Sequence, residues 1–203
     1  MRRVLILLAV AALAGCGDDD EPTAVTTTPT ETAAATTTST STTTATNGID
    51  PLEGASTNPV TAEPKGLDTA LHERLAVARH EGYDRVVFQF RNALPGYRVE
   101  YVEGPLKEDG SGNPVQIQGN HYVVVRMEPA SGFDLNTAEG VIVYTGPRRI
   151  SGADAGTSVV REVVRTGDFE AVLTWAIGLE DRVDFRVLTL SGPPRLVVDF
   201  RNH

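Results

Sequence analysis

Apolar and polar residues alternate in three segments of this chain, and the alternation restricts the fold more than any other feature of the sequence. The apolar members are Val86, Phe88, Phe90, Val183, Phe185, Val187, Leu196, Val198 and Phe200. Because successive side chains of a β-strand point to opposite faces, each segment predicts a strand with one face in a core. We expect these nine side chains to form that core.

Further short apolar segments follow along the chain. They span residues 71–79, 97–102, 122–127, 140–144, 159–165 and 169–177, and turn signals such as Glu81-Gly82 and Thr166–Asp168 separate them. Eight or nine short strands at this spacing predict an all-β domain, an antiparallel β-sandwich of two small sheets. Trp175 is expected in its core. The apolar spacing within residues 159–165 also fits a short helix, which is the alternative there.

The first residues have the composition of an export signal. Met1-Arg2-Arg3 precedes ten apolar residues, fewer than the roughly 20 that span a bilayer, and the run ends in Leu13-Ala14-Gly15-Cys16. This end resembles the lipobox of bacterial lipoproteins. The resemblance implies cleavage before Cys16, diacylglycerol on its thiol and an extracytoplasmic protein anchored to the lipid bilayer. Cys16 is the only cysteine; an incidental thiol in an ordinary signal or short membrane anchor is the alternative.

A stretch built almost entirely from Thr, Ala and Ser follows the cysteine, from Thr23 to Thr46. Such a composition buries too little apolar surface to offset the entropy of ordering, so we expect a disordered tether, with an O-glycosylated stalk as an alternative. The expected organisation is a signal peptide at 1–15, the lipidated cysteine and linker at 16–57, and one β domain at 58–203. The formal net charge of −9 disfavours nucleic acid as a partner.

Two strand motifs carry a family resemblance. Asp84-Arg-Val-Val-Phe88 comes early, and Pro194-Arg-Leu-Val-Val-Asp-Phe200 comes near the end. They resemble the AMIN and AMIN-like domains, named for the N-terminal domain of N-acetylmuramoyl-L-alanine amidases, over residues 60–201. Residues 169–179 are similar to the AMIN-like branch of actinobacterial lipoproteins. The resemblance implies a β-sandwich that contacts peptidoglycan or another envelope polymer without catalysis, and it brings no ligand residues with it.

Catalytic motifs are missing from the sequence, so we expect neither an enzyme, nor a cofactor, nor a metal site. Four histidines are present, at positions 72, 80, 121 and 203, and we expect them on the surface. Two carboxylates, Asp84 and Asp199, are the candidates for the alternative of glycan hydrolysis.

Arginines on the polar face of the alternating strands are the candidate binding residues. We expect Arg85, Arg91 and Arg195 to contact an anionic ligand, and Tyr97 and Tyr122 to stack on sugar rings. The alternative is that these arginines pair with acids across the strands. The sequence therefore predicts a tethered module that binds the cell envelope. A protein-interaction domain that scaffolds or regulates an envelope complex is the second hypothesis.

Overall fold

The computed structural model describes residues 50–203. The signal peptide, Cys16 and the Thr-rich stretch lie outside the described residues. Residues 50–203 form strands joined by turns and loops, so the predicted all-β class is confirmed. No helix within this range is long and apolar enough to cross a membrane.

The described part of the chain contains thirteen strands. They are β1 (Val60–Ala62), β2 (Ala70–His80), β3 (Tyr83–Phe90), β4 (Gly96–Val102), β5 (His121–Glu128), β6 (Ala130–Ser131), β7 (Phe133–Asp134), β8 (Val141–Ile142), β9 (Arg149–Ser151), β10 (Val160–Phe169), β11 (Val172–Leu179), β12 (Phe185–Leu190) and β13 (Arg195–Arg201). One sheet has the order β1-β4-β5-β11-β10-β9, and the other has the order β12-β13-β3-β2-β6. All their pairs are antiparallel except β2 with β6.

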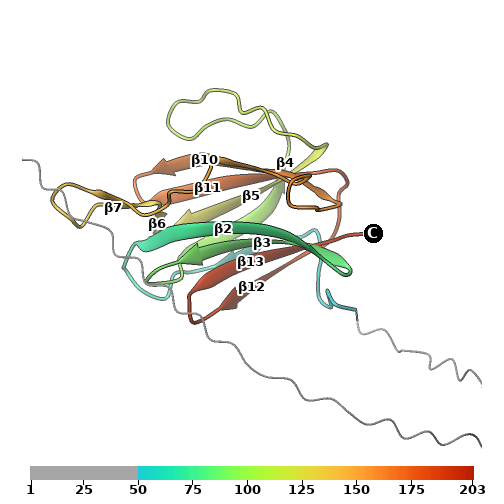
Figure 1. The fold of residues 1–203 in the computed structure, drawn as a ribbon, viewed down its shortest axis with the longest axis horizontal. Helices are drawn as coiled ribbons and strands as arrows, with labels where there is room; N and C mark the ends of the chain where they lie inside the picture. The colour runs from blue at the N-terminus through green and yellow to red at the C-terminus, as the bar shows by residue number, and fades with distance from the viewer. Residues whose placement is uncertain (1–49) are drawn as a thin grey trace, which may run out of the picture. The chain divides into compact units, whose positions relative to one another are not determined.

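The two sheets lie face to face as a sandwich (Figure 1), and the core fills the space between them. Eight of the nine side chains predicted for the core are buried, and Val187 is half-buried against them. Trp175 is fully buried, as expected. The prediction succeeds because the period of two assigns each strand one apolar face, whichever strand pairs with it.

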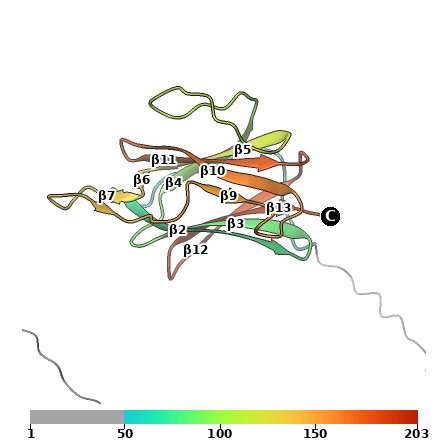
Figure 2. The ribbon, with the colours of Figure 1, turned by 45° about the horizontal axis from the view of Figure 1, so that its top comes forward.

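A small two-stranded ribbon, β7 with β8, projects from one end of the sandwich. Figures 1 and 2 both show it at the end opposite the C-terminus. The predicted strand at 140–144 is reduced to Val141–Ile142 within this ribbon.

The predicted hairpin at Glu81-Gly82 is confirmed, with Gly82 at a φ of 84° between β2 and β3. The turn predicted at Thr166–Asp168 is wrong, because these residues lie inside β10. The chain turns instead at Glu170 and Ala171, whose φ values are 51° and 59°. Gly167 serves close packing here: a Cβ on it would overlap the side chain of Asp109.

The helix considered for residues 159–165 is also not formed, since Val160 begins the long strand β10. The apolar spacing of this segment fits a helix as well as a strand. The segment forms a strand because it pairs with β11 on one side and with β9 on the other. The packed part of the chain begins before residue 58. Leu52 is fully buried, and Asp50 forms an ion pair with Arg201 at 2.9 Å.

Candidate functional site

Arg85 lies on the outer face of the five-stranded sheet and is held there by a buried carboxylate. Its Nε and Nη2 donate to Asp199 at 2.6 and 2.9 Å, and Arg186 donates to the same carboxylate at 3.0 Å. Donation of hydrogen bonds to the Asp199 carboxylate raises the pKa of Arg85. The side chain of Asp199 is fully buried, so water does not reach its carboxylate. Arg85→Glu would place a second carboxylate next to it, and the two negative charges would repel each other. Reversal of Arg85 is therefore expected to destabilise the fold.

Arg91 and Arg195 lie further along the same face, one on each side of Gln89. Arg195 is opposite Gln89 in the ladder of β13 with β3, and Arg91 follows β3 directly. Arg91 contacts Glu73 at 3.4 Å with half of its side chain exposed, and Arg195 donates to the carbonyl of Pro193 at 3.3 Å. These two guanidinium groups keep hydrogen-bonding capacity for a ligand.

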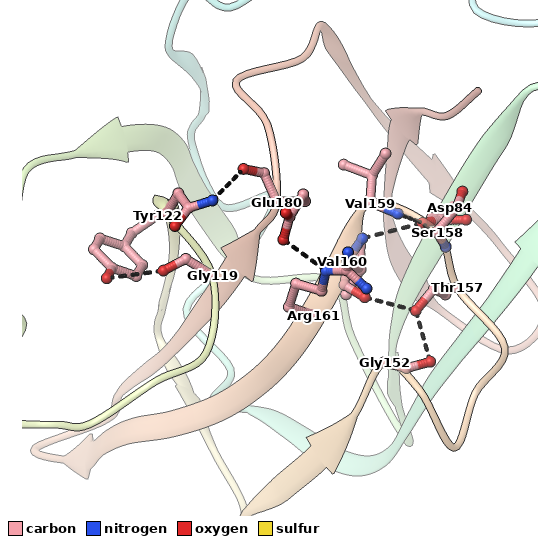
Figure 3. A network of polar contacts seen from close by, with 11 residues as sticks. Asp84, Gly119, Tyr122, Gly152, Thr157, Ser158, Val159, Val160, Arg161 and Glu180 are labelled. Carbon is pink, nitrogen blue, oxygen red and sulfur yellow. Dashed lines mark hydrogen bonds and ion pairs between the residues drawn. The ribbon is translucent and has the colours of Figure 1, made fainter.

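Tyr97 and Tyr122 lie near opposite ends of the ladder between β4 and β5. Tyr97 is opposite Met127, whereas Tyr122 is opposite Val102. Tyr97 is half-buried against the core, and burial raises its pKa. The hydroxyl of Tyr122 donates to the carbonyl of Gly119 at 3.1 Å (Figure 3). The structure therefore separates the two tyrosines from each other, and it places both on a different sheet from the three arginines.

A hollow of about 440 Å³ lies beside Tyr97, where β1, β4 and β5 meet. Its lining consists of Thr61, Ala62, Glu63, Pro64, Gly96, Tyr97, Arg98, Arg126, Glu128 and Pro129. A Cβ on Gly96 would come within 2.6 Å of Cδ of Pro64, so a glycine is required for Pro64 to close this side. Tyr97 is opposite the fully buried Met127, so its ring lies on the core side of β4, whereas the side chains of Arg98 and Arg126 lie on the other side of the sheet.

The two charged pairs of this hollow sit on the exposed face of β4 and β5. Arg98 lies opposite Arg126 in the ladder. Each is neutralised by the glutamate two residues further on, Glu100 at 2.6 Å and Glu128 at 3.0 Å. The hydrogen bond from Arg98 lowers the pKa of Glu100. These exposed groups offer donors and acceptors side by side.

Asp84 and Asp199 do not form a catalytic carboxylate pair. They occupy neighbouring positions in the ladder of β3 with β13, so one faces the core and the other faces outward. Asp84 is fully buried, and its Oδ2 accepts hydrogen bonds from the backbone N–H groups of Ser158, Val159 and Val160 at 2.9, 2.7 and 3.1 Å (Figure 3). Asn202 donates to its other oxygen. This carboxylate joins the five-stranded sheet to the start of β10.

His72 is fully buried, so the expectation of a surface position is wrong for this histidine. Its ring stacks on Tyr144 at 4.6 Å, and Phe88, Phe90 and Trp175 surround it. A register shift between His72 and Arg74 breaks the alternation of β2 and turns the ring inward. Within residues 50–203 no three His, Cys, Asp or Glu side chains are grouped to hold a metal ion.

The comparison with known families agrees with the strand motifs. The family model of the AMIN-like domain matches residues 71–202, from β2 to the asparagine that binds Asp84. No curated protein and no solved structure matches the chain. AMIN-like domains are extracytoplasmic, envelope-associated and generally non-catalytic binding domains. With two thirds of its residues covered by that model, the chain belongs to the AMIN-like domain family.

Proposed function

We propose that this protein is a lipoprotein that holds a non-catalytic binding domain outside the cytoplasmic membrane, where the domain binds peptidoglycan or a polymer attached to it. Membership of the AMIN-like family supports the envelope ligand. The lipobox ending in Cys16 supports the anchor, since two acyl chains hold a protein stably on a bilayer.

The hollow beside Tyr97 is the observation that carries the proposed ligand. Its volume of about 440 Å³ lies within the range of ligand sites, roughly 300 to 1,000 Å³. A sugar unit presents an apolar face and a ring of hydroxyl groups. The charged side chains of Arg126 and Glu128 match the hydroxyl groups, and Pro64 and Pro129 in the lining offer apolar surface.

Sedimentation of the detergent-purified full chain with isolated peptidoglycan tests this proposal. We expect the wild-type protein to sediment, and Arg126→Glu to stay largely in the supernatant. Arg126 is exposed, so its reversal alters the hollow without removing core contacts. Tyr122→Ala is the matched control, because this tyrosine lies at the other end of the same ladder. Equal sedimentation of all three proteins would place the binding surface elsewhere.

The outer face of the five-stranded sheet is the second proposed contact, for an anionic polymer. Arg91 and Arg195 supply the hydrogen-bond donors that a ligand could use. Arg85 is instead held in its ion pair with Asp199. Reversing Arg91 and Arg195 together to Glu is expected to lower sedimentation with whole cell walls and to remove its salt dependence. If the double variant melts at the wild-type temperature and sediments as the wild type does, this face does not bind the polymer. Exposed charges are screened within roughly 8 to 10 Å at 0.1 to 0.15 M salt, so the effect is largest at low ionic strength.

Binding of a protein partner is the second candidate function, and the ribbon of β7 and β8 favours it. The ribbon exposes Phe133, Leu135, Val141 and Ile142, and Phe169 at the end of β10 is exposed as well. Among residues 50–203 only one other large apolar side chain is exposed, that of Leu67. Such a group of apolar side chains is typical of protein interaction sites. Leu135→Asp combined with Ile142→Asp is expected to abolish a protein complex and to leave peptidoglycan sedimentation unchanged.

A further inference from the structure

Apolar side chains gather at the end of the sandwich from which the ribbon of β7 and β8 projects (Figure 2). We name four of them the apolar end: Phe133, Leu135, Ile142 and Phe169, which are 38%, 79%, 62% and 62% exposed. Phe133 and Ile142 are directly opposite each other in the ladder of β7 with β8, so they lie on the same side of the ribbon. Phe133 and Phe169 line one hollow together. Side chains from the ribbon and from the end of β10 therefore form one exposed group.

A crevice of about 60 Å³ lies at the base of the ribbon. Four of its seven lining residues are apolar, namely Leu71, Phe133, Leu135 and Ala171. One water molecule needs roughly 10 to 15 Å³ of such space, so the crevice holds only about four to six atoms. This volume fits one aliphatic side chain and is too small for a sugar ring. The crevice therefore suits a protein segment better than a glycan chain.

Acidic residues surround the apolar end. Four of them are Asp68, Asp134, Glu139 and Glu170. Three of the four are next in the chain to a residue of the apolar end or of the crevice, and Glu139 lies in the turn of the ribbon. Within residues 50–203 none of the four forms an ion pair. Segments 66–71, 131–143 and 166–172 contain no Lys, Arg or His, so no base of these segments neutralises the acids.

The charge around the apolar end selects among the ligands that an apolar surface attracts. Negative charge repels anionic polymers and anionic lipid headgroups, and it attracts a partner with basic side chains. The outer face of the five-stranded sheet is the opposite case, since Arg91 and Arg195 supply positive charge there. The apolar end and that face therefore suit different ligands.

We propose that the apolar end docks a segment of another extracytoplasmic protein in which an aliphatic side chain is flanked by lysine or arginine. The aliphatic side chain fills the crevice beside Leu135, and the flanking cations lie against Asp68 and Glu139. This proposal rests on the second candidate function given above, and it names the chemistry of the partner.

Fluorescence anisotropy with the full chain in phosphatidylcholine nanodiscs tests this chemistry. The probe is the labelled peptide acetyl-Lys-Lys-Leu-Val-Leu-Lys-Lys-amide. One comparison peptide has glutamate in place of every lysine, and the other has Ser-Gly-Ser in place of Leu-Val-Leu. We expect the probe to bind at least about ten-fold more tightly than either comparison peptide. Phosphatidylcholine carries no net charge, so the bilayer does not attract the lysines of the probe.

Two variants separate the apolar contribution from the charge. Leu135→Ser is expected to weaken binding of the probe about five-fold. Leu135 is 79% exposed, so this change removes few contacts of the folded domain. Asp68→Lys combined with Glu139→Lys is expected to reverse the preference, so that the glutamate peptide binds more tightly than the probe. Loss of structure would instead weaken binding of both peptides.

Glu53→Lys combined with Glu81→Lys is the matched control, because it changes the net charge by the same amount. Glu81 lies in the hairpin turn at the far end of β2, whereas the first residues of β2 lie beside the ribbon. Glu53 follows Pro51, which packs against Gly82 of that turn. We expect this variant to bind all three peptides as the wild type does.

Three outcomes would overturn the proposal: equal binding of the probe and the glutamate peptide, no binding of the probe at about 1 mM, or wild-type binding by Leu135→Ser. Sedimentation of Cys16→Ser with phosphatidylcholine vesicles, lost when Leu135→Ser is added, would show that the apolar end binds lipid instead. A protein complex that Leu135→Asp with Ile142→Asp abolishes, together with peptide binding that ignores charge, would uphold the second candidate function and refute only the partner chemistry.

Discussion

His72 makes the stability of the domain depend on pH in a way that the structure allows us to calculate. Burial lowers the pKa of His72 from 6.5 to about 4. The backbone of Arg74 and the charge of Glu73 oppose this shift, whereas the positive charge of Arg165 adds to it. Neither ring nitrogen has a hydrogen-bond partner of good geometry in the described part of the chain. The folded domain therefore keeps this ring neutral.

The sign of the effect follows from the lowered pKa. Between about pH 6.5 and pH 4 the unfolded chain binds a proton at His72 and the folded domain does not. The contribution of His72 to stability is complete above pH 6.5 and is lost as the pH falls toward 4. A difference of about 2.5 pKa units corresponds to roughly 3 kcal/mol, of which most is lost by pH 4.5.

Urea unfolding of the wild type and of His72→Phe at pH 7.5 and pH 4.5 measures this contribution. Other acids also titrate in this range, so the quantity of interest is the difference between the two proteins. We expect the wild type to lose roughly 2 to 3 kcal/mol more than His72→Phe. His72→Leu repeats the comparison in case Phe overpacks the site. An equal loss in all three proteins, or a ring that titrates near pH 6.5 by NMR, would refute the reasoning.

Four further predictions follow from single features. Asp84→Ala is expected to cost about 3 to 5 kcal/mol in urea unfolding, and Asp84→Asn clearly less, because the amide oxygen still accepts from the backbone N–H groups; equal costs would contradict this. Glu170→Asn with Ala171→Gly is expected to stabilise the domain by about 1 kcal/mol, since both positions have positive φ; a lower urea midpoint would contradict it. Cys16→Ser is expected to remove incorporation of labelled fatty acid, and label on the variant would exclude this cysteine as the anchor. Deletion of Thr23–Thr46 is expected to shift the melting temperature by less than about 3 °C, or roughly 1 kcal/mol; a larger shift would mean that the stretch packs.

The candidate site shows how far sequence reasoning reaches. Tyr97 was predicted to stack on sugar rings, but it is opposite Met127 and is half-buried against the core, beside a hollow where β1, β4 and β5 meet.

The sequence by itself determined the class of the fold and the buried face of the main strands. Phe88 and Val198 are buried because the period of two is a local property of a strand, and one apolar face needs a core whatever its partner. The family was also predictable, since its strand motifs are contiguous in the chain.

The tertiary structure decided what the polar groups do. Arg85 is held by an acid 114 residues away, and Asp84 binds backbone donors 74 to 76 residues away. His72 faces inward because a register shift in β2 overrides the alternation. Hydrogen bonds and ion pairs depend on the register of the strands and on contacts between residues far apart in the sequence. The local pattern of apolar and polar residues predicts neither the register nor these contacts.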